Sequence, residues 1–358
     1  GGGSGGAAGA RQTKGYELGG SSGVAAAADS AASPAAAPGG DQSAMYGSLN
    51  LGDGLVVDGY GRFLVRHLAQ GVDVTLSTVV ERIEYGAGGE GGEGGGEGGG
   101  EGGGARLALA DGGEMHADYV IVTLPLGVLQ RAPAEGGVAF SPPLSARKRE
   151  AIAALGMGTE NKVVLRWEAA DVFWPRAAPY LNCTDQRFRF LNLHYFGKPG
   201  VLLANVAPPF STTMEAMDDA EVLGVLLPLL RSTFAPSLPE LPPLLEAHVT
   251  RWGADPYSRG SYSFDQLGSC VAHRSALRAP EGGDDEHGPR LFFAGEACSI
   301  DAPQCVHGAY ETGEEAAAEL LRTIAIGTAR GSQASSPPHP ASAPAPASLP
   351  SSLSLSLS

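Results

Sequence analysis

Apolar residues in the middle of the chain follow two kinds of spacing. The stretch ARLALADGGEMHADYVIVTLP, residues 105–125, first alternates apolar and polar positions and then becomes a continuous apolar run. Alternation is typical of a half-buried strand, whereas an unbroken apolar run is typical of a strand covered on both faces. The pattern predicts a hairpin that leads into a buried central strand over 119–124. Pro125 ends this strand at the sheet edge where ligands usually bind.

Helical and strand spacing alternate on both sides of this stretch. Upstream, the pattern predicts a short strand, a turn and a helix closed by Gly71 within residues 55–71, then two short strands within 72–85. Downstream, it predicts a helix over 144–154, strands over 161–167, 188–196 and 201–206, a helix over 218–234, and strands over 246–252 and 290–295. This mixture is typical of an α/β fold that contains an α+β unit.

Three segments lack the large apolar side chains that a core needs. Residues 1–44 are mainly Gly, Ala and Ser, residues 86–104 form a Gly/Glu spacer, and residues 327–358 are rich in Pro and Ser. Burial in such segments is too small to offset the conformational entropy of the chain. All three are predicted to be disordered, with the spacer joining two strands as a flexible insertion.

Charge and cysteine content narrow the classes of partner. The chain has 24 Lys and Arg against 39 Asp and Glu, a formal net charge of -15, which argues against direct nucleic-acid binding and favours cationic ligands. The four cysteines form no CxxC pair, which predicts reduced thiols and an intracellular protein. The sequence does not distinguish between cytoplasm, nucleus and an organelle. No apolar run approaches the ~20 residues that span a bilayer, so no membrane partner is expected.

Residues 289–321 place a strand end at Gly295-Glu296 and a helix start near His307-Gly308. A turn followed by an ordinary amphipathic helix explains this pattern. From this stretch alone that explanation is favoured. A ligand site is the alternative, because a helix N-terminus carries about half a positive charge and glycine permits close approach of the backbone.

Four motifs together resemble one family. They are TLPLGVL (123–129), ENKVVLRW (160–167), RWGADPYSRGSYS (251–263), and RLFFAGEA with VHGAYETG (290–297 and 306–313). Their order and spacing are similar to those of the flavin-containing amine oxidases, which include polyamine oxidases and lysine-specific histone demethylases. The resemblance implies an FAD-binding Rossmann-like domain, here residues 45–135 and 251–326, with an inserted α+β substrate-binding domain, residues 136–250.

One part of that family's fold has no counterpart in the sequence. A Rossmann-like domain begins with a βαβ unit that carries GxGxxG between a strand and a helix. Gly1, Gly3 and Gly6 have this spacing, but no strand pattern precedes them and no helix pattern follows. We therefore expect the FAD-binding domain to be incomplete, with its first βαβ unit missing.

The resemblance implies a set of cofactor-binding residues. Gly295 and Glu296 would lie against the ribityl and pyrophosphate groups of FAD, and the helix from Val306 would point its N-terminus at the flavin ring. The other implied FAD contacts are Val80 at the adenine, and Thr123, Leu124, Pro125, Trp252, Tyr257 and Cys305.

The same resemblance implies a catalytic pair. Lys162 would hold a water molecule at flavin N5, and Tyr262 would orient the amine in the substrate site, with Cys305 and His307 on the wall. Many amine oxidases have a second tyrosine near the position of Cys305, so this difference favours a demethylase or a plant-type polyamine oxidase. Cys298, Cys305 and His307 lack a fourth ligand, so no metal site is expected.

The implied reaction is oxidation of a C–N bond in a small cationic amine. A polyamine of the spermine or spermidine type would give a hydride to the flavin, and O2 would reoxidise it with release of H2O2. A lysine-specific histone demethylase that binds a histone tail is the second hypothesis. The third is a flavin-free fragment or scaffold, because the nucleotide-binding motif is missing.

Overall fold

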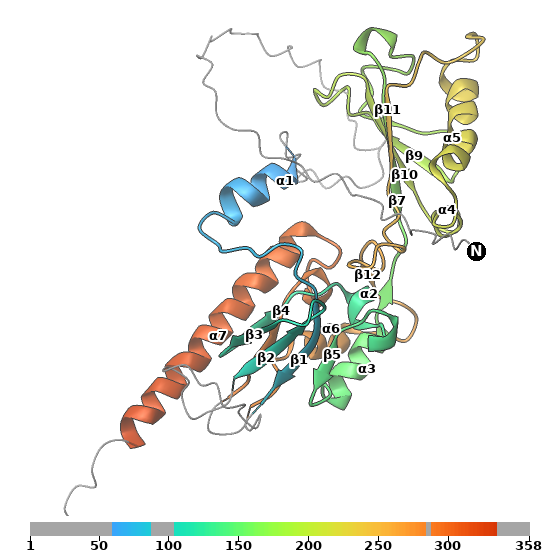
Figure 1. The fold of residues 1–358 in the computed structure, drawn as a ribbon. Coiled ribbons are helices and arrows are strands. Elements are labelled where there is room, and N and C mark those ends of the chain that lie inside the picture. Colours follow the sequence, from blue (N-terminus) through green and yellow to red (C-terminus); the bar gives the residue numbers. More distant parts are fainter. Residues whose placement is uncertain (1–58, 87–103, 284–287, 335–358) are drawn as a thin grey trace, which may run out of the picture. The chain divides into compact units, whose positions relative to one another are not determined.

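The computed structural model describes residues 59–86, 104–283 and 288–334 (Figure 1). The chain divides into two compact units, Gly1–Val56 and Val57–Ser358, and all described residues belong to the second. The expected mixture of helices and strands is confirmed. The strand expected before Asp58 and most residues of the three low-complexity segments lie outside the described residues.

A four-stranded sheet has the order β3-β2-β1-β5. Its strands are β1 (Val80–Tyr85), β2 (Ala105–Leu109), β3 (Glu114–Ala117) and β5 (Ala139–Ser141). β1 and β2 pair antiparallel with Tyr85 opposite Ala105, so the Gly/Glu spacer connects two neighbouring strands. The predicted hairpin is confirmed as β2 and β3.

A second sheet contains β4 (Val120–Val122) and β13 (Leu291–Phe293), which run parallel. All three residues of β13 are buried, as predicted. The prediction that β4 is buried on both faces is wrong, because Ile121 is 36% exposed. Among the described residues β13 is the only strand that pairs with β4, so one side of β4 has no strand beside it.

A five-stranded antiparallel sheet has the order β11-β7-β10-β9-β8. Its strands are β7 (Asn161–Arg166), β8 (Tyr180–Leu181), β9 (Phe188–Leu191), β10 (Val201–Val206) and β11 (Glu246–Val249). One face packs against α4 (Phe210–Met214) and α5 (Asp219–Phe234) in a buried core, and α5 begins with a capping box from Asp218 and Glu221. Because side chains alternate, Lys162 and Arg166 lie on the other face.

The remaining helices lie mainly around the first two sheets. They are α2 (Leu126–Leu129), α3 (Ala146–Ala154), α6 (Val271–Arg278) and α7 (Val306–Ala334). α7 begins where the sequence predicts and continues eight residues beyond position 326, where the tail was expected to start. None of the helices in the described ranges is long and apolar enough to cross a membrane.

Short elements complete the described chain. They are β6 (Gly156–Met157), which pairs with β12 (Ser263–Phe264), and the 3-10 helices η3 (Pro133–Glu135), η4 (Ala169–Asp171) and η5 (Glu296–Cys298).

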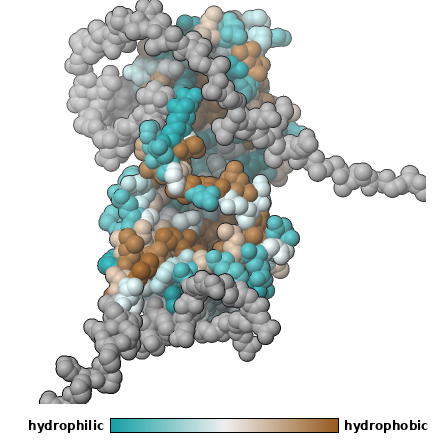
Figure 2. All heavy atoms as spheres, turned by 60° about the vertical axis from the view of Figure 1, so that its left-hand side comes forward, coloured by the Kyte–Doolittle hydropathy of each residue, from teal (hydrophilic) through white to brown (hydrophobic). Residues whose placement is uncertain are grey.

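The segment that precedes β1 is exposed and apolar. It consists of α1 (Tyr60–Phe63), the π-helix η2 (Leu64–Leu68) and an irregular stretch, so only one of the two strands predicted in residues 72–85 forms. No residue of α1 or η2 is buried. Val65 in η2 is 71% exposed, and Leu76 in the irregular stretch is 80% exposed. Hydrophobic residues also gather at the level of β1 to β4 on the face in Figure 2. Such surface is typical of a region that packs against further protein.

Candidate functional site

A cavity lies where two parallel strands end. β4 and β13 point the same way, so the residues that follow them meet at one edge. Thr123–Pro125 after β4 and Ala294–Glu296 after β13 line a cavity of about 400 Å³. This is the edge of an α/β sheet at which ligands bind, and the volume is typical of a small-molecule site.

The other walls come from distant parts of the chain. Trp252 belongs to the RWGADPYSRGSYS motif, and Ala309 and Gly313 belong to the first turns of α7. Leu126, Met157, Leu277, Phe293 and Cys298 add apolar surface. The cavity therefore combines an apolar wall with a few polar groups, as expected for a cofactor or substrate site.

Glu296 is the carboxylate of this cavity, and its position is fixed by hydrogen bonds. Its two oxygens accept from the Ser263 backbone N–H and hydroxyl, both at 2.8 Å, and from the Gln304 N–H at 2.8 Å. The buried guanidinium of Arg274 donates to the Ser263 hydroxyl at 3.0 Å. A carboxylate held in this way keeps acceptor capacity for a ligand hydroxyl group.

A buried asparagine fixes the loop that carries Trp252. The side-chain oxygen of Asn161 (Oδ1) accepts from the Trp252 backbone N–H at 3.0 Å, and its side-chain amide nitrogen donates to the Glu215 carboxylate at 2.6 Å. Glu215 accepts in turn from the backbone N–H groups of Gly253 and Ala254, at 3.0 and 2.9 Å. Asn161 is fully buried, so this hydrogen-bond network fixes the position of the loop.

Lys162 follows Asn161 but is not among the residues that line the cavity. Its side chain is exposed, on the open face of the five-stranded sheet. Its backbone N–H donates to the Thr250 hydroxyl at 2.8 Å, and the Thr250 N–H donates to its carbonyl at 2.9 Å. The Thr250 hydroxyl also donates to Asn161, so hydrogen bonds link the backbone of Lys162 to the loop of Trp252.

Six of the predicted site residues line the cavity together: Thr123, Leu124, Pro125, Trp252, Gly295 and Glu296. Seven do not: Val80, Lys162, Tyr257, Tyr262, Cys305, Val306 and His307. Tyr257 is 64% exposed, and Val80 lies in β1 opposite Leu109. Cys305 is half-buried, whereas Val306 and His307 are exposed at the start of α7.

Tyr262 lies beside the cavity and donates its hydroxyl hydrogen bond to Glu160. Burial and the neighbouring Glu160 carboxylate raise the pKa of Tyr262 to about 12. The hydroxyl therefore stays protonated at neutral pH.

Gly308 permits a close contact between two parts of the backbone. A Cβ atom at this buried position would lie 2.0 Å from the carbonyl oxygen of Ala302. This contact folds the Asp301–Cys305 loop onto the first turn of α7.

Gly308→Ala should destabilise the protein by about 1 to 3 kcal/mol, because overpacking forces the loop away from the helix. Gly327→Ala on the same helix is the control. A Cβ atom there meets nothing within 4 Å, so the better helix propensity of alanine should stabilise by about 0.5 to 1 kcal/mol. Urea denaturation of both variants measures the difference, and equal effects would contradict the packing account.

Several residues of this site were not predicted from the sequence: Met157, Glu160, Asn161, Glu215, Ser263 and Arg274. Glu160 and Asn161 lie beside Lys162 in a motif that was recognised. Asn161 bonds to Glu215, 54 residues away along the chain, and Glu160 bonds to Tyr262, 102 residues away. Local spacing carries no signal for such contacts.

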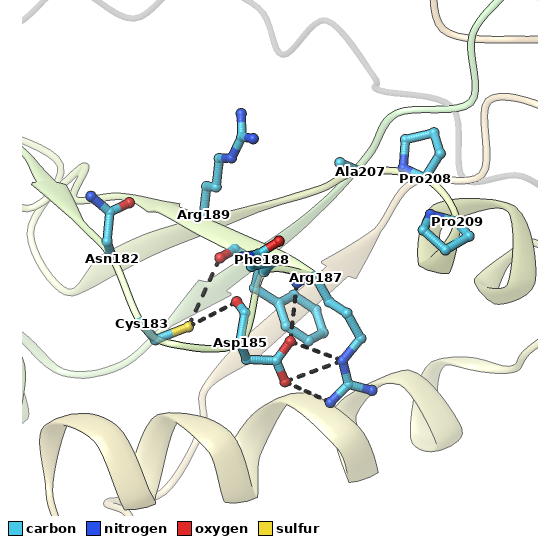
Figure 3. Close-up of a pocket in the computed structure, with 10 residues that line it drawn as sticks. Asn182, Cys183, Asp185, Arg187, Phe188, Arg189, Ala207, Pro208 and Pro209 are labelled. Atoms are coloured by element: carbon cyan, nitrogen blue, oxygen red, sulfur yellow. Dashed lines mark hydrogen bonds and ion pairs between the residues drawn. The ribbon is translucent and has the colours of Figure 1, made fainter. Parts of the chain in front are cut away.

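A second cavity, of about 380 Å³, lies between β9 and the Ala207–Pro209 segment (Figure 3). Two of its charged groups pair with each other, because Arg187 donates to both carboxylate oxygens of Asp185, and Arg187 also lies over the Phe188 and Phe210 rings. Burial raises the pKa of the Cys183 thiol, whose sulfur faces the Asp185 and Phe188 carbonyls. A neutral thiol is a weak nucleophile, so this cavity has little catalytic potential.

A cavity at the carboxyl ends of parallel strands, with the first turns of a helix in its wall, has the position at which α/β proteins commonly bind ligands. Comparison with known proteins identifies the family. Residues 17–321 match the flavin containing amine oxidoreductases, and the chain belongs to this family.

Individual relatives are similar over most of this chain. Polyamine oxidase 5 of Oryza sativa subsp. japonica is 34% identical over 279 residues, which are 76% of this chain and 49% of that protein. Lysine-specific histone demethylase 1 homolog 1 of the same plant is 33% identical over 279 residues, 76% of this chain and 29% of that protein. The chain thus spans about half the length of the polyamine oxidase, and less of the demethylase.

Solved structures show the same fold. A putrescine oxidase variant matches with a TM-score of 0.57 and 20% sequence identity, over 74% of this chain and 53% of that chain.

The cavity residues fit part of a flavin. Gly295 has a φ of +124°, and no atom lies within 4 Å of the place where a Cβ would be, so this backbone is open to a ligand. Glu296 offers a fixed acceptor, and Leu124, Pro125 and Phe293 offer an apolar surface for a flat ring. A Gly-rich phosphate loop between a strand and a helix is not found in the described ranges, so this fit concerns only the flavin end of FAD.

Proposed function

We propose that the chain is the flavin-binding and substrate-binding part of an FAD-dependent amine oxidase that acts on polyamines. The observation that carries the proposal is the shared cavity: residues from three separate family motifs, Thr123–Pro125, Trp252 and Gly295–Glu296, line it together. The negative net charge suits a cationic amine. The 34% identity with a polyamine oxidase supports this substrate class.

In this proposal each residue has a distinct task. Bound flavin supplies hydride acceptance and reoxidation by O2. Glu296 would accept a hydrogen bond from the cofactor, and Trp252 would border the ring. Lys162 holds a water molecule near the reacting atoms, and Tyr262 orients the substrate amine. The first turns of α7 supply a positive dipole end near the cofactor.

The domain arrangement is part of the same proposal. Residues 45–135 and 251–326 would form an incomplete Rossmann-like FAD-binding domain, and residues 136–250 would form the substrate-binding domain, which contains the five-stranded sheet. The exposed apolar α1 and η2 segment and the open side of β4 support the view that the FAD-binding domain lacks a layer.

Demethylation of a lysine in a histone tail is the second candidate. It is favoured by the 33% identity with a demethylase homologue and by Cys305, at a position where many amine oxidases have a tyrosine. H2O2 release with spermine or spermidine, compared with demethylation of a methyl-lysine peptide, separates the two.

Flavin binding tests the proposal directly. Purified protein should take up FAD and become yellow, with the absorbance bands of a bound flavin. Glu296→Gln should weaken binding about tenfold or more, because an acceptor fixed by three hydrogen bonds loses its charge. The control Glu311→Gln changes an exposed carboxylate on α7 and should bind FAD as the wild type does. Protein that stays colourless in excess FAD would refute the enzyme hypothesis for this chain and support the flavin-free fragment or scaffold.

A further inference from the structure

A carboxylate beside the cavity has spare binding capacity. Glu160 is half-buried, one residue before β7, and its side chain accepts a hydrogen bond from the Tyr262 hydroxyl. Within the part of the chain that the structure describes, this carboxylate has no other hydrogen bond and no ion pair. An ionised carboxylate has about four acceptor positions, and a half-buried one is costly to leave without a cation.

Backbone hydrogen bonds place this carboxylate at the flank of the cavity. The Glu160 N–H donates to the Ser261 hydroxyl at 3.0 Å, and Ser261 lines the cavity. The Gly158 N–H donates to the Tyr262 carbonyl, and the Ser261 N–H donates to the Gly158 carbonyl, both at 2.8 Å. Glu160 and Tyr262 therefore lie on two hydrogen-bonded segments beside the cavity.

Positive charge limits where a cation can bind on this sheet. Glu160 and Lys162 are two residues apart and lie on the same open face. Asn205 lies opposite Lys162 in β10, and Arg189 lies opposite Asn205 in β9, so two exposed cations share one row. Arg189 also acts electrostatically on Tyr262, so this row lies close to the Glu160–Tyr262 pair, and an ammonium group is attracted by the Glu160 carboxylate and repelled by Arg189.

We propose that Glu160 and Tyr262 together bind the ammonium group of the amine substrate, with Glu160 as a specificity-determining residue. The proposal rests on the proposed function and adds to it the group that recognises the cation. The carboxylate forms a charge-assisted hydrogen bond with the ammonium, and the tyrosine ring offers its face to the same charge. The Tyr262 hydroxyl fixes the position of one oxygen of this carboxylate.

Spermidine binding to the purified chain tests this proposal without catalysis. In isothermal titration calorimetry at about 150 mM salt, where exposed charges are largely screened, Glu160→Gln should weaken binding about tenfold to a hundredfold. Tyr262→Phe should cause a smaller loss. The control Glu246→Gln removes the same charge from β11, where Glu246 pairs with Arg166 at the end of β7 away from Glu160, and should leave binding unchanged.

FAD absorbance, measured on the same samples, separates this proposal from the proposed function. Loss of spermidine affinity in Glu160→Gln with unchanged circular dichroism supports the ammonium site, whether or not FAD binds. Wild-type protein that fails to bind spermidine overturns it. Glu160→Gln that binds as tightly as the wild type, or an equal loss in Glu246→Gln, also overturns it. If no sample binds FAD, the proposed enzyme activity is refuted, and the spermidine measurements still decide whether Glu160 binds the ammonium group.

Discussion

Lys162→Met should slow polyamine oxidation by the flavin-loaded protein about a hundredfold or more, the range that a positioned proton-transfer group contributes. In the proposed role Lys162 holds a water molecule at the reacting atoms, and methionine has a similar length but no polar group. The fold should tolerate the change, because the side chain is exposed and its stability effect should stay within about 0.5 kcal/mol. Stopped-flow measurement of flavin reduction and reoxidation tells which step slows.

Arg166→Met is the matched control for this variant. Arg166 lies on the same strand and the same face as Lys162, and it pairs with Glu246 at the surface. Arg166→Met should leave the rates of flavin reduction and reoxidation unchanged. Equal rates for Lys162→Met and the wild type would remove Lys162 from the mechanism, even though the motif that contains it matches the family.

The position of Lys162 makes this test informative. The residue does not line the cavity, yet its backbone is bonded to Thr250, and its neighbour Asn161 holds the N–H of Trp252. The lysine and the tryptophan therefore belong to one rigid unit of strand and loop. Whether the side chain reaches the reacting atoms is the question that the rate measurement answers.

Much of the fold could be predicted because its signals are local. The alternation in residues 105–117 predicts β2 and β3, and the 161–166 strand and the start of α7 at Val306 agree with the structure. Each pattern depends on residues a few positions apart, and burial of one face produces it directly.

Other features depended on neighbours that no local pattern reveals. The apolar run at 119–124 has the composition of a central strand, but burial needs a partner on each side, and β4 pairs with β13 alone among the described strands. Residues 72–79 alternate like a strand and form none. The sheet topology, and not the residue pattern, decides such cases.

The site was predicted in part for the same reason. The motifs located the residues after β4 and β13, since strand ends at one sheet edge converge. The Asn161–Glu215 and Glu160–Tyr262 contacts join residues 54 and 102 positions apart, so only the folded chain reveals them.

Behind the cavity wall lies a buried lysine that should make stability depend on pH. Lys148 in α3 is fully buried, and its ammonium group donates to the carbonyls of Ala276, Leu277 and Ala279 at the end of α6. It also lies 3.7 Å from the centre of the Phe293 ring, which lines the cavity. Burial lowers the pKa of Lys148 from 10.5 to about 8, although the charges of Glu281 and Cys298 act in the opposite direction.

The sign of the effect follows from proton binding. Below about pH 8 the lysine is protonated in both the folded and the unfolded chain, so it adds no pH dependence. Between about pH 8 and 10.5 the folded chain loses this proton while the unfolded chain keeps it. The free energy of unfolding rises with pH wherever the unfolded state binds more protons. The contribution of Lys148 to stability should therefore increase across this window.

Lys148→Met should remove this dependence, because methionine fills the space without titrating. The difference in free energy of unfolding between wild type and variant should grow by about 3 kcal/mol between pH 8 and 10.5, since each pKa unit corresponds to about 1.4 kcal/mol. Urea denaturation at several pH values measures it, and the subtraction cancels the tyrosines and thiols common to both proteins. Lys198→Met, at an exposed lysine, should give a constant difference. A constant difference for Lys148→Met as well would mean that burial does not lower the pKa of this ammonium group, and that its three carbonyl partners compensate fully for the lost hydration.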